Sequence, residues 1–198
     1  KGTIYDGEQP AGSIGSDSVS ALIKQAREDD RVKALVMRID SPGGSATAAE
    51  QIRYELELTQ QAGKPVVASM ATYAASGGYW ISATANQILA SPTTITGSIG
   101  TFLLFPTFNQ SLAEIGVYSD GIGTNVLSGA LNPLQSLNPA LQQILDLAIN
   151  NTYRQFISLV ARGRDMTPAA VDRVAQGRVW AGTTALDLGL IDAIGGLE

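Results

Sequence analysis

The chain has 198 residues, which is enough for one domain with a sizeable core. Thirteen basic and eighteen acidic residues give a net charge of −5, and no cluster of lysine or arginine stands out, which disfavours a nucleic-acid partner. The chain has no cysteine and no histidine, which excludes disulfides, thiol catalysis and a Ser-His-Asp triad built from this chain alone. We therefore expect no cofactor and no metal.

The chain begins with residues 1–15, which are rich in glycine and turn formers and predict an arm with at most one short strand, near residues 3–5. A helix is predicted to follow this arm. Asp17 or Ser18 is expected to cap the helix, and an apolar stripe through Leu22 and Ile23 is expected to face the core. These assignments put one helix before the first strand of the main sheet.

Two short apolar runs predict neighbouring strands. Residues 32–39 (VKALVMRI) form a nearly continuous apolar run, as in a strand that is covered on both faces of a parallel sheet. A helix is expected next, because Thr47 and Glu50 have the spacing of a capping box, and residues 65–69 are predicted to form the following strand. This order favours βαβ crossovers, with functional loops at the carboxyl ends of the strands.

No charged residue occurs between Lys64 and Glu114. A membrane span needs about 20 predominantly apolar residues, whereas glycines, Asn86 and Pro92 interrupt this stretch. We interpret it as buried strands, one of them at residues 87–90, and tight loops around a site. Neither a signal peptide nor a membrane anchor is visible in the chain.

The rest of the chain is predicted to be mainly helical. Residues 108–116 are expected to form a short helix and residues 121–137 an irregular loop. A long helix at about residues 139–162 is a candidate for packing against another copy or domain. Thr167 is predicted to cap a helix that has proline at its first position, and a further short helix is predicted after a turn at residues 177–182.

Glycine-bearing loops follow the two predicted strands, at the same edge of the sheet. Backbone N–H groups of Gly44 (or Gly43) and of Gly77 can converge there into an oxyanion hole beside the Ser76 hydroxyl. A serine at a strand-to-helix turn also has the placement of an acyl-transfer nucleophile. Taken singly, each loop has an ordinary explanation, namely a turn at Gly43-Gly44 and a small packed serine at position 76.

Taken together, the glycine loops and the closing segment resemble the serine peptidases of the signal peptide peptidase A family, also called protease IV. The resemblance implies a Clp-protease/crotonase-like α/β fold with a mostly parallel sheet, βαβ crossovers and flanking helices, forming one peptidase domain over residues 1–198. The matching segments are DSPGG (40–44), YAASGGYWIS (73–82), TGSIG (96–100) and GRVWAGTTALDLGLID (177–192).

The resemblance also implies roles for individual residues. Ser76 matches the nucleophile of a Ser/Lys dyad, and Ser98 matches a serine that orients the lysine amine, its ordinary alternative being a turn serine. Gly43, Gly44 and Gly77 then belong to the oxyanion hole.

A base for Ser76 is hard to find among the lysines of the chain. In the short form of the family the lysine comes from a segment like residues 162–171, where this chain has Asp165. The long form has two tandem copies of the fold, so we expect this chain to be the carboxyl-terminal copy, with the amino-terminal half of the same protein supplying the lysine. Lys33 and Lys64 stand where the two predicted strands begin. A strand of about five to seven residues spans about 15–20 Å, so neither amine can reach Ser76 at the far end. The four lysines are Lys1, Lys24, Lys33 and Lys64.

For the whole protein, the resemblance implies a homotetramer at the periplasmic face of the bacterial inner membrane. Its substrates would be cleaved signal peptides or other apolar peptides, and the isolated fragment is expected to be inactive. Two alternatives stay open, namely a non-catalytic assembly half and a crotonase-like acyl-CoA enzyme. An aspartic or metal-dependent hydrolase is disfavoured, because the chain has no paired-carboxylate motif and no histidine ligand.

Overall fold

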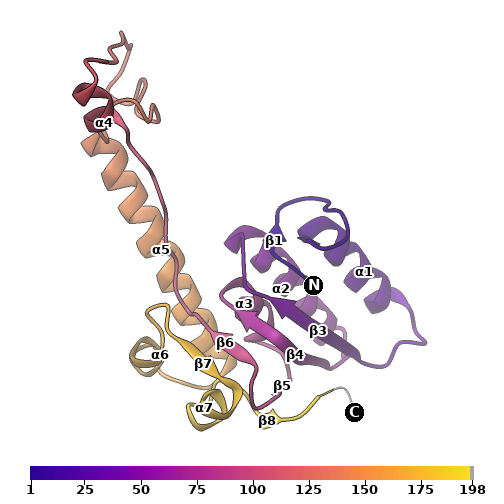
Figure 1. The fold of residues 1–198 in the computed structure, drawn as a ribbon. Helices are drawn as coiled ribbons and strands as arrows, with labels where there is room; N and C mark the ends of the chain where they lie inside the picture. Colours follow the sequence, from indigo (N-terminus) through magenta and orange to yellow (C-terminus); the bar gives the residue numbers. More distant parts are fainter. Residues whose placement is uncertain (197–198) are drawn as a thin grey trace. The chain divides into compact units, whose positions relative to one another are not determined.

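The fold contains a six-stranded sheet, in which every strand pairing is parallel except that of β6 with β7 (Figure 1). The computed structural model describes residues 1–196, which form two compact units, one of residues 1–100 with the residues from 154 onward and one of residues 101–153. The expectation of one peptidase domain over residues 1–198 stays a prediction. The sheet contains β3 (Leu35–Ser41), β4 (Val66–Ala75), β5 (Gln87–Ala90), β6 (Ile95–Gly97), β7 (Val179–Ala181) and β8 (Ala193–Ile194).

The central strand is β4. It pairs with β3 along one side, and with β5 and then β6 along the other. The prediction of parallel neighbouring strands at residues 32–39 and 65–69 is confirmed. However, β4 continues beyond residue 69 to Ala75, and the next helix begins at Gly77, directly after Ser76. The extension is stabilised by pairing with β6, a contact that the local pattern does not contain.

Helices cover one face of this sheet. α2 (Ala46–Gln61) and α3 (Gly77–Ser82) pack against β4, and α1 (Ser16–Glu28) packs against α2. The expectation that β3 is covered on both faces is wrong for this chain, since the Val36 side chain is 52% exposed and β3 pairs only with β4. A continuous apolar run predicts that both faces of a strand are shielded from water. It does not tell whether the groups that shield the second face belong to the same chain.

The helix caps differ from their predicted positions. Gly15 is the N-cap of α1, so Asp17 lies in the first turn instead of capping it, and Leu22 is 65% exposed while Ile23 is buried. Gly15 is already fixed in a short parallel pair of strands, β1 (Ile4–Tyr5) with β2 (Ile14–Gly15), of which the sequence indicated only the first. The helix therefore starts where β2 ends.

The capping-box prediction for α2 is also wrong. Ser45 is the N-cap, and its Oγ accepts a hydrogen bond of 3.2 Å from the Ala48 N–H. Thr47 lies inside the helix, and the Glu50 carboxylate is hydrogen-bonded to Arg53 and Trp80 rather than to the start of α2.

The unit of residues 101–153 contains α4 (Asn109–Glu114) and the first part of α5 (Pro139–Gly163). Both helices were predicted, as was the absence of helix and strand at residues 121–137. Leu141 is the one buried residue within 101–153, so the unit does not cover its own apolar side chains. Those most exposed are Phe102, Leu104, Ile115, Tyr118, Ile122 and Val126.

The carboxyl-terminal segment belongs to the same compact unit as residues 1–100. Thr167 caps α6 (Pro168–Val174) as predicted, accepting a hydrogen bond from the Ala170 N–H. α7 (Gly182–Asp187) follows β7, and β8 then pairs with β5. Across residues 1–196, no helix has both the length and the apolar character that a bilayer crossing requires.

Asp192 joins this segment to β5, and its substitution should lower stability in a pH-dependent way. Its carboxylate accepts hydrogen bonds from Arg164 (2.6 Å) and from the Ile88 N–H (2.7 Å). Burial alone would raise the pKa of Asp192, but these hydrogen bonds outweigh burial and hold the pKa below its ordinary value of 3.8. Because the folded-state pKa is depressed, the stabilisation is complete above pH 3.8 and is lost as the pH falls through the folded-state pKa.

We predict that Asp192→Asn lowers the free energy of unfolding by about 2 kcal/mol at pH 7, the usual size for a lost charge-assisted hydrogen bond. Urea unfolding at a series of pH values should show this difference shrinking below pH 3.8. Asp187→Asn, at an exposed position of α7, is the control and should have no such effect. A difference that grows on acidification would contradict this assignment.

Candidate active site

Ser76 forms the sharp turn between β4 and α3. Its backbone has φ 52° and ψ −118°, a conformation that residues other than glycine rarely adopt. Two hydrogen bonds hold the turn, since the Ser76 N–H donates to the Gly97 carbonyl (2.9 Å) and the Ser76 carbonyl accepts from the Trp80 N–H (2.8 Å). Strained turns of this kind occur at strand-to-helix junctions that present a nucleophilic serine.

The Gly43-Gly44 loop lies directly against Ser76. A Cβ atom built on Gly43 would be 2.7 Å from Ser76 Cβ and 3.1 Å from Ser76 Oγ, and one built on Gly77 would be 3.3 Å from Gly44 N. The Gly43 N–H already donates to Ser41 Oγ (3.1 Å), whereas neither Gly44 N–H nor Gly77 N–H has a hydrogen-bond partner within residues 1–196. Of the two glycines predicted as oxyanion-hole donors in this loop, Gly44 rather than Gly43 therefore has the free N–H group.

The amino-terminal arm supports this loop, which the sequence did not indicate. The Ile4 N–H donates to the Gly43 carbonyl and the Ser45 N–H donates to the Ile4 carbonyl, both at 2.9 Å. Ile4 is fully buried, and its Cδ1 would lie 3.1 Å from a Cβ on Gly77. A single apolar residue in a glycine-rich segment carries too little pattern to predict this role.

Ser98 directly follows β6, the strand that pairs with the end of β4. Ala75 at the end of β4 is paired with Gly97 at the end of β6, so Ser76 and Ser98 each follow one member of that pair. Ser98 also has a positive φ, 49°, and its N–H donates to the Arg178 carbonyl (2.7 Å). The hydroxyl groups of both serines lack hydrogen-bond partners in the described part of the chain, and both residues are partly exposed.

Each lysine amine of the chain has a partner other than Ser76. Lys64 donates to the carbonyls that end α1, among them those of Arg27 and Asp29. Lys33 donates to the Asp30 carbonyl, Lys24 lies 4.0 Å from Glu28, and Lys1 lies 3.2 Å from Asp40. That another segment supplies the general base stays a prediction.

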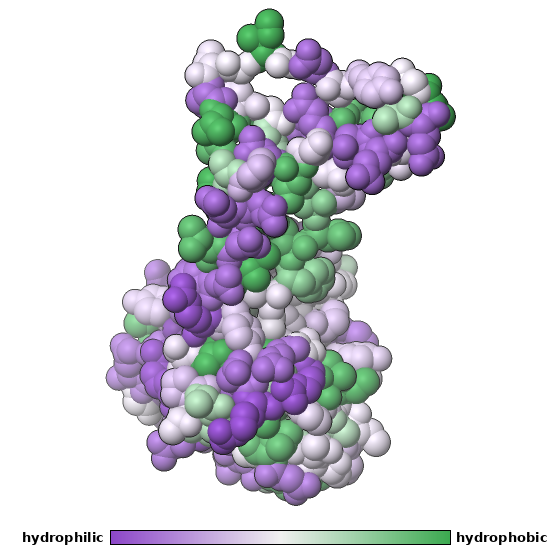
Figure 2. Space-filling model, turned by 90° about the vertical axis from the view of Figure 1, so that its left-hand side faces the viewer, coloured by the Kyte–Doolittle hydropathy of each residue, from purple (hydrophilic) through white to green (hydrophobic). Residues whose placement is uncertain are grey.

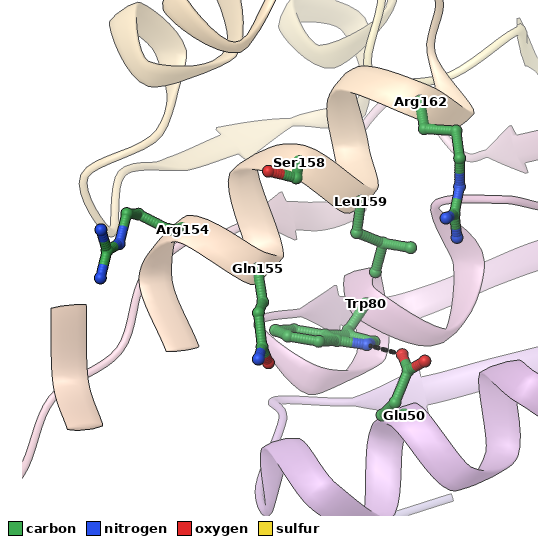
Figure 3. Close-up of a pocket in the computed structure, with 7 residues that line it drawn as sticks. All are labelled: Glu50, Trp80, Arg154, Gln155, Ser158, Leu159 and Arg162. Atoms are coloured by element: carbon green, nitrogen blue, oxygen red, sulfur yellow. Dashed lines mark hydrogen bonds between the residues drawn. The ribbon is translucent and has the colours of Figure 1, made fainter. Parts of the chain in front are cut away.

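A pocket of about 520 Å³ lies beside α3 and is lined by residues of α2, α3 and α5 (Figure 3). At its wall the Trp80 indole N–H donates to the Glu50 carboxylate at 2.7 Å. Burial would raise the pKa of Glu50, but hydrogen bonds from Arg53 and Trp80 outweigh burial and lower it, so Glu50 is ionised at neutral pH. The other lining residues are Arg154, Gln155, Ser158, Leu159 and Arg162.

Comparison with known proteins identifies the family. The family described as peptidase family S49 matches residues 59–198. The chain is 49% identical over 197 residues to Protease 4 of Salmonella typhi, an alignment that covers the whole chain and 32% of that relative. It is 36% identical over 190 residues to the chloroplastic Serine protease SPPA of Arabidopsis thaliana, with 96% of the chain and 28% of the relative covered.

The chain therefore belongs to peptidase family S49, a family that includes serine proteases. Peptidases of this family have the Clp-protease-like fold, in agreement with the mixed α/β architecture. Protease 4 of Haemophilus influenzae is 46% identical over 197 residues, covering 98% of the chain and 32% of the relative. The chain thus spans about a third of the length of these relatives.

Gly43 offers a direct test of the contact between the two loops. Gly43→Ala places a methyl group against Ser76 at a φ of 117°, and we expect it to lower the free energy of unfolding by about 3 kcal/mol through overpacking and strain. Gly63→Ala is the matched control, because Gly63 also has a positive φ, 82°, but has open space around it. It should cost only about 1 kcal/mol. Equal losses in denaturant unfolding would mean that Gly43 does not contact Ser76.

Proposed function

We propose that this chain supplies the nucleophile and the oxyanion hole of a serine endopeptidase that uses a Ser/Lys dyad. The observation that carries the proposal is the contact between the strained Ser76 turn and the Gly43-Gly44 loop, which leaves two free N–H groups beside the serine hydroxyl. Membership of peptidase family S49 supports the same reaction class.

The chemistry follows from these groups. The Ser76 Oγ attacks the carbonyl carbon of the scissile peptide bond while its proton passes to the lysine amine. The carbonyl oxygen becomes an oxyanion and accepts hydrogen bonds from Gly44 and Gly77, each typically worth about 3 kcal/mol of barrier. Collapse of this intermediate expels the amine product, which takes the proton, and water then hydrolyses the acyl-enzyme.

The lysine is proposed to come from the amino-terminal half of a longer protein, with this chain as the carboxyl-terminal copy. Two observations support this arrangement: every lysine of the chain has other partners, and the chain is about a third as long as its relatives. A lysine placed in a partly apolar cleft has a lowered pKa and can accept the serine proton. Ser98, which directly follows the neighbouring strand β6 and has a free hydroxyl, is proposed to orient that amine.

The proposed substrates are signal peptides or other apolar peptides. β4, α3 and β6, which hold Ser76 and lead to Ser98, come from the segment without charged residues, so a charged substrate side chain would find no partner on these elements. We also propose a homotetramer on the periplasmic face of a bacterial inner membrane, anchored outside this chain. The exposed apolar side chains of residues 101–153 support an assembly, because monomeric proteins rarely expose so many. Figure 2 shows green apolar patches on the surface.

The same exposed apolar surface favours the main alternative, a non-catalytic assembly half. In that case Ser76 would be structural, and its hydroxyl would be dispensable for peptide hydrolysis. Substitution of Ser76 separates the two functions.

We predict that the isolated chain hydrolyses peptides at least about 100-fold more slowly than the complete protein, because general-base assistance is worth that much or more. Peptide turnover and labelling of Ser76 by a fluorophosphonate probe should be measured for the chain alone and for the complete protein. Ser76→Ala should abolish both signals in the complete protein. Full activity in that variant would support the assembly half, and efficient turnover by the pure chain would mean that one of its own lysines is the base.

A second prediction concerns the cleaved bond. A peptide library digested by the complete protein should be cut after small or apolar residues and rarely after Asp, Glu or Lys, because an unpaired charge is costly to bury. The products can be sequenced by mass spectrometry, with Ser76→Ala protein as the blank. A strong preference for a charged residue would contradict an apolar site.

A further inference from the structure

The two free backbone donors lie at the starts of two different helices. Gly44 immediately precedes Ser45, the N-cap of α2, and Gly77 is the first residue of α3. The separation of the two N–H groups therefore depends on how α3 is placed against α2. Within the described residues, one side-chain hydrogen bond joins these helices, from the Trp80 indole N–H to the Glu50 carboxylate (2.7 Å, Figure 3).

Glu50 is held rigidly at its end of this contact. The Arg53 guanidinium forms two parallel hydrogen bonds to the carboxylate, Nε to Oε2 and Nη2 to Oε1, both at 2.8 Å. Arg53 is itself only 3% exposed and is anchored further by Glu57 at 2.7 Å. Bidentate pairs of this kind fix orientation as well as distance.

Trp80 is equally constrained at the other end. Its side chain is buried, and its ring lies 4.5 Å from the ring of Phe156. Its own backbone N–H donates to the Ser76 carbonyl at 2.8 Å, so the indole and the nucleophile belong to the same helical turn. A shift of Trp80 relative to Glu50 would therefore move Ser76 and Gly77 relative to Gly44.

We propose that Glu50, Arg53 and Trp80, here called the clamp, are positioning residues that set the geometry of the oxyanion hole. The inference rests on the proposed function, since it assigns the clamp to the Gly44 and Gly77 donors. None of the three side chains needs to touch the substrate. Loss of the clamp should weaken interactions with the tetrahedral intermediate more than interactions with the bound peptide, so it should lower kcat with little change in KM.

The surroundings of the clamp make it testable without unfolding the protein. The Glu50 side chain is 45% exposed and faces the pocket of about 520 Å³, so water can replace a lost indole N–H. Trp80→Phe keeps an aromatic ring against Phe156 and removes the donor. Tyr79→Phe is the matched control, because it removes one buried hydroxyl from the same helix, and that hydroxyl bonds to the Leu190 carbonyl (2.8 Å) rather than to α2.

The experiment compares the two variants in the complete protein. For Trp80→Phe we expect kcat to fall about tenfold or more, KM to stay within about twofold, and affinity for a peptide boronate, whose tetrahedral adduct occupies the oxyanion hole, to fall by a factor similar to that of kcat. For Tyr79→Phe we expect an equal or larger drop in Tm and a kcat within about twofold of wild type. Equal kcat losses in both variants, or none in Trp80→Phe, would overturn the proposal.

A double-mutant cycle separates a specific contact from general loosening. Glu50→Ala should lower kcat about as much as Trp80→Phe, and the double variant should lose little more than either single one, because both remove the same hydrogen bond. Additive losses would mean that the two residues act independently and would contradict the clamp. Ser76→Ala is measured alongside: if it is inactive while Trp80→Phe is normal, only the clamp is wrong, whereas full activity of Ser76→Ala would refute the proposed function and the clamp together.

Discussion

The structure depends on how the end of β4 is held. Ala74 is paired with Ser41 on one side and with Thr96 on the other, and the Thr96 hydroxyl also donates to the Ala74 carbonyl at 2.7 Å. Ala74 is thus held on both edges, and Ala75, the residue before the turn, is paired with Gly97 of β6. A positive φ at a serine costs about 1–3 kcal/mol, and this pairing is what allows Ser76 to keep it. The same pairing brings Ser98 to the neighbouring strand end.

Glycine at positions 43 and 44 matters because two backbones meet there. A Cβ on Gly44 would lie 2.0 Å from the Ile4 carbonyl oxygen, and a Cβ on Gly43 would overlap Ser76. The close approach leaves the Gly44 N–H beside Gly77 and lets the buried arm hold the loop from behind. Because the donors are backbone groups, their direction is set by the loops and helices that carry them, so helix placement becomes part of the chemistry.

Other surfaces of the chain expose large apolar side chains that a folded protein normally covers. One face of the sheet leaves Val36 half exposed, although parallel sheets are normally covered on both faces. Residues 101–153 bury only Leu141 and expose large apolar side chains such as Phe102 and Ile122. These features agree with a chain that spans about a third of its relatives. They contrast with the Ser76 turn, where the neighbouring loops are in close contact within this chain.

The sequence by itself determined the order of the parallel strands β3 and β4 and the meeting of their glycine loops near Ser76, because apolar runs and turn residues act locally. The tertiary structure alone decided the rest. It paired β7 with β6, bound the Ser45 N–H at the start of α2 to the Ile4 carbonyl and turned Glu50 toward Trp80, a residue thirty positions away. Such contacts join residues that are distant in sequence, and their choice depends on which groups packing leaves within hydrogen-bond reach, which no local pattern records.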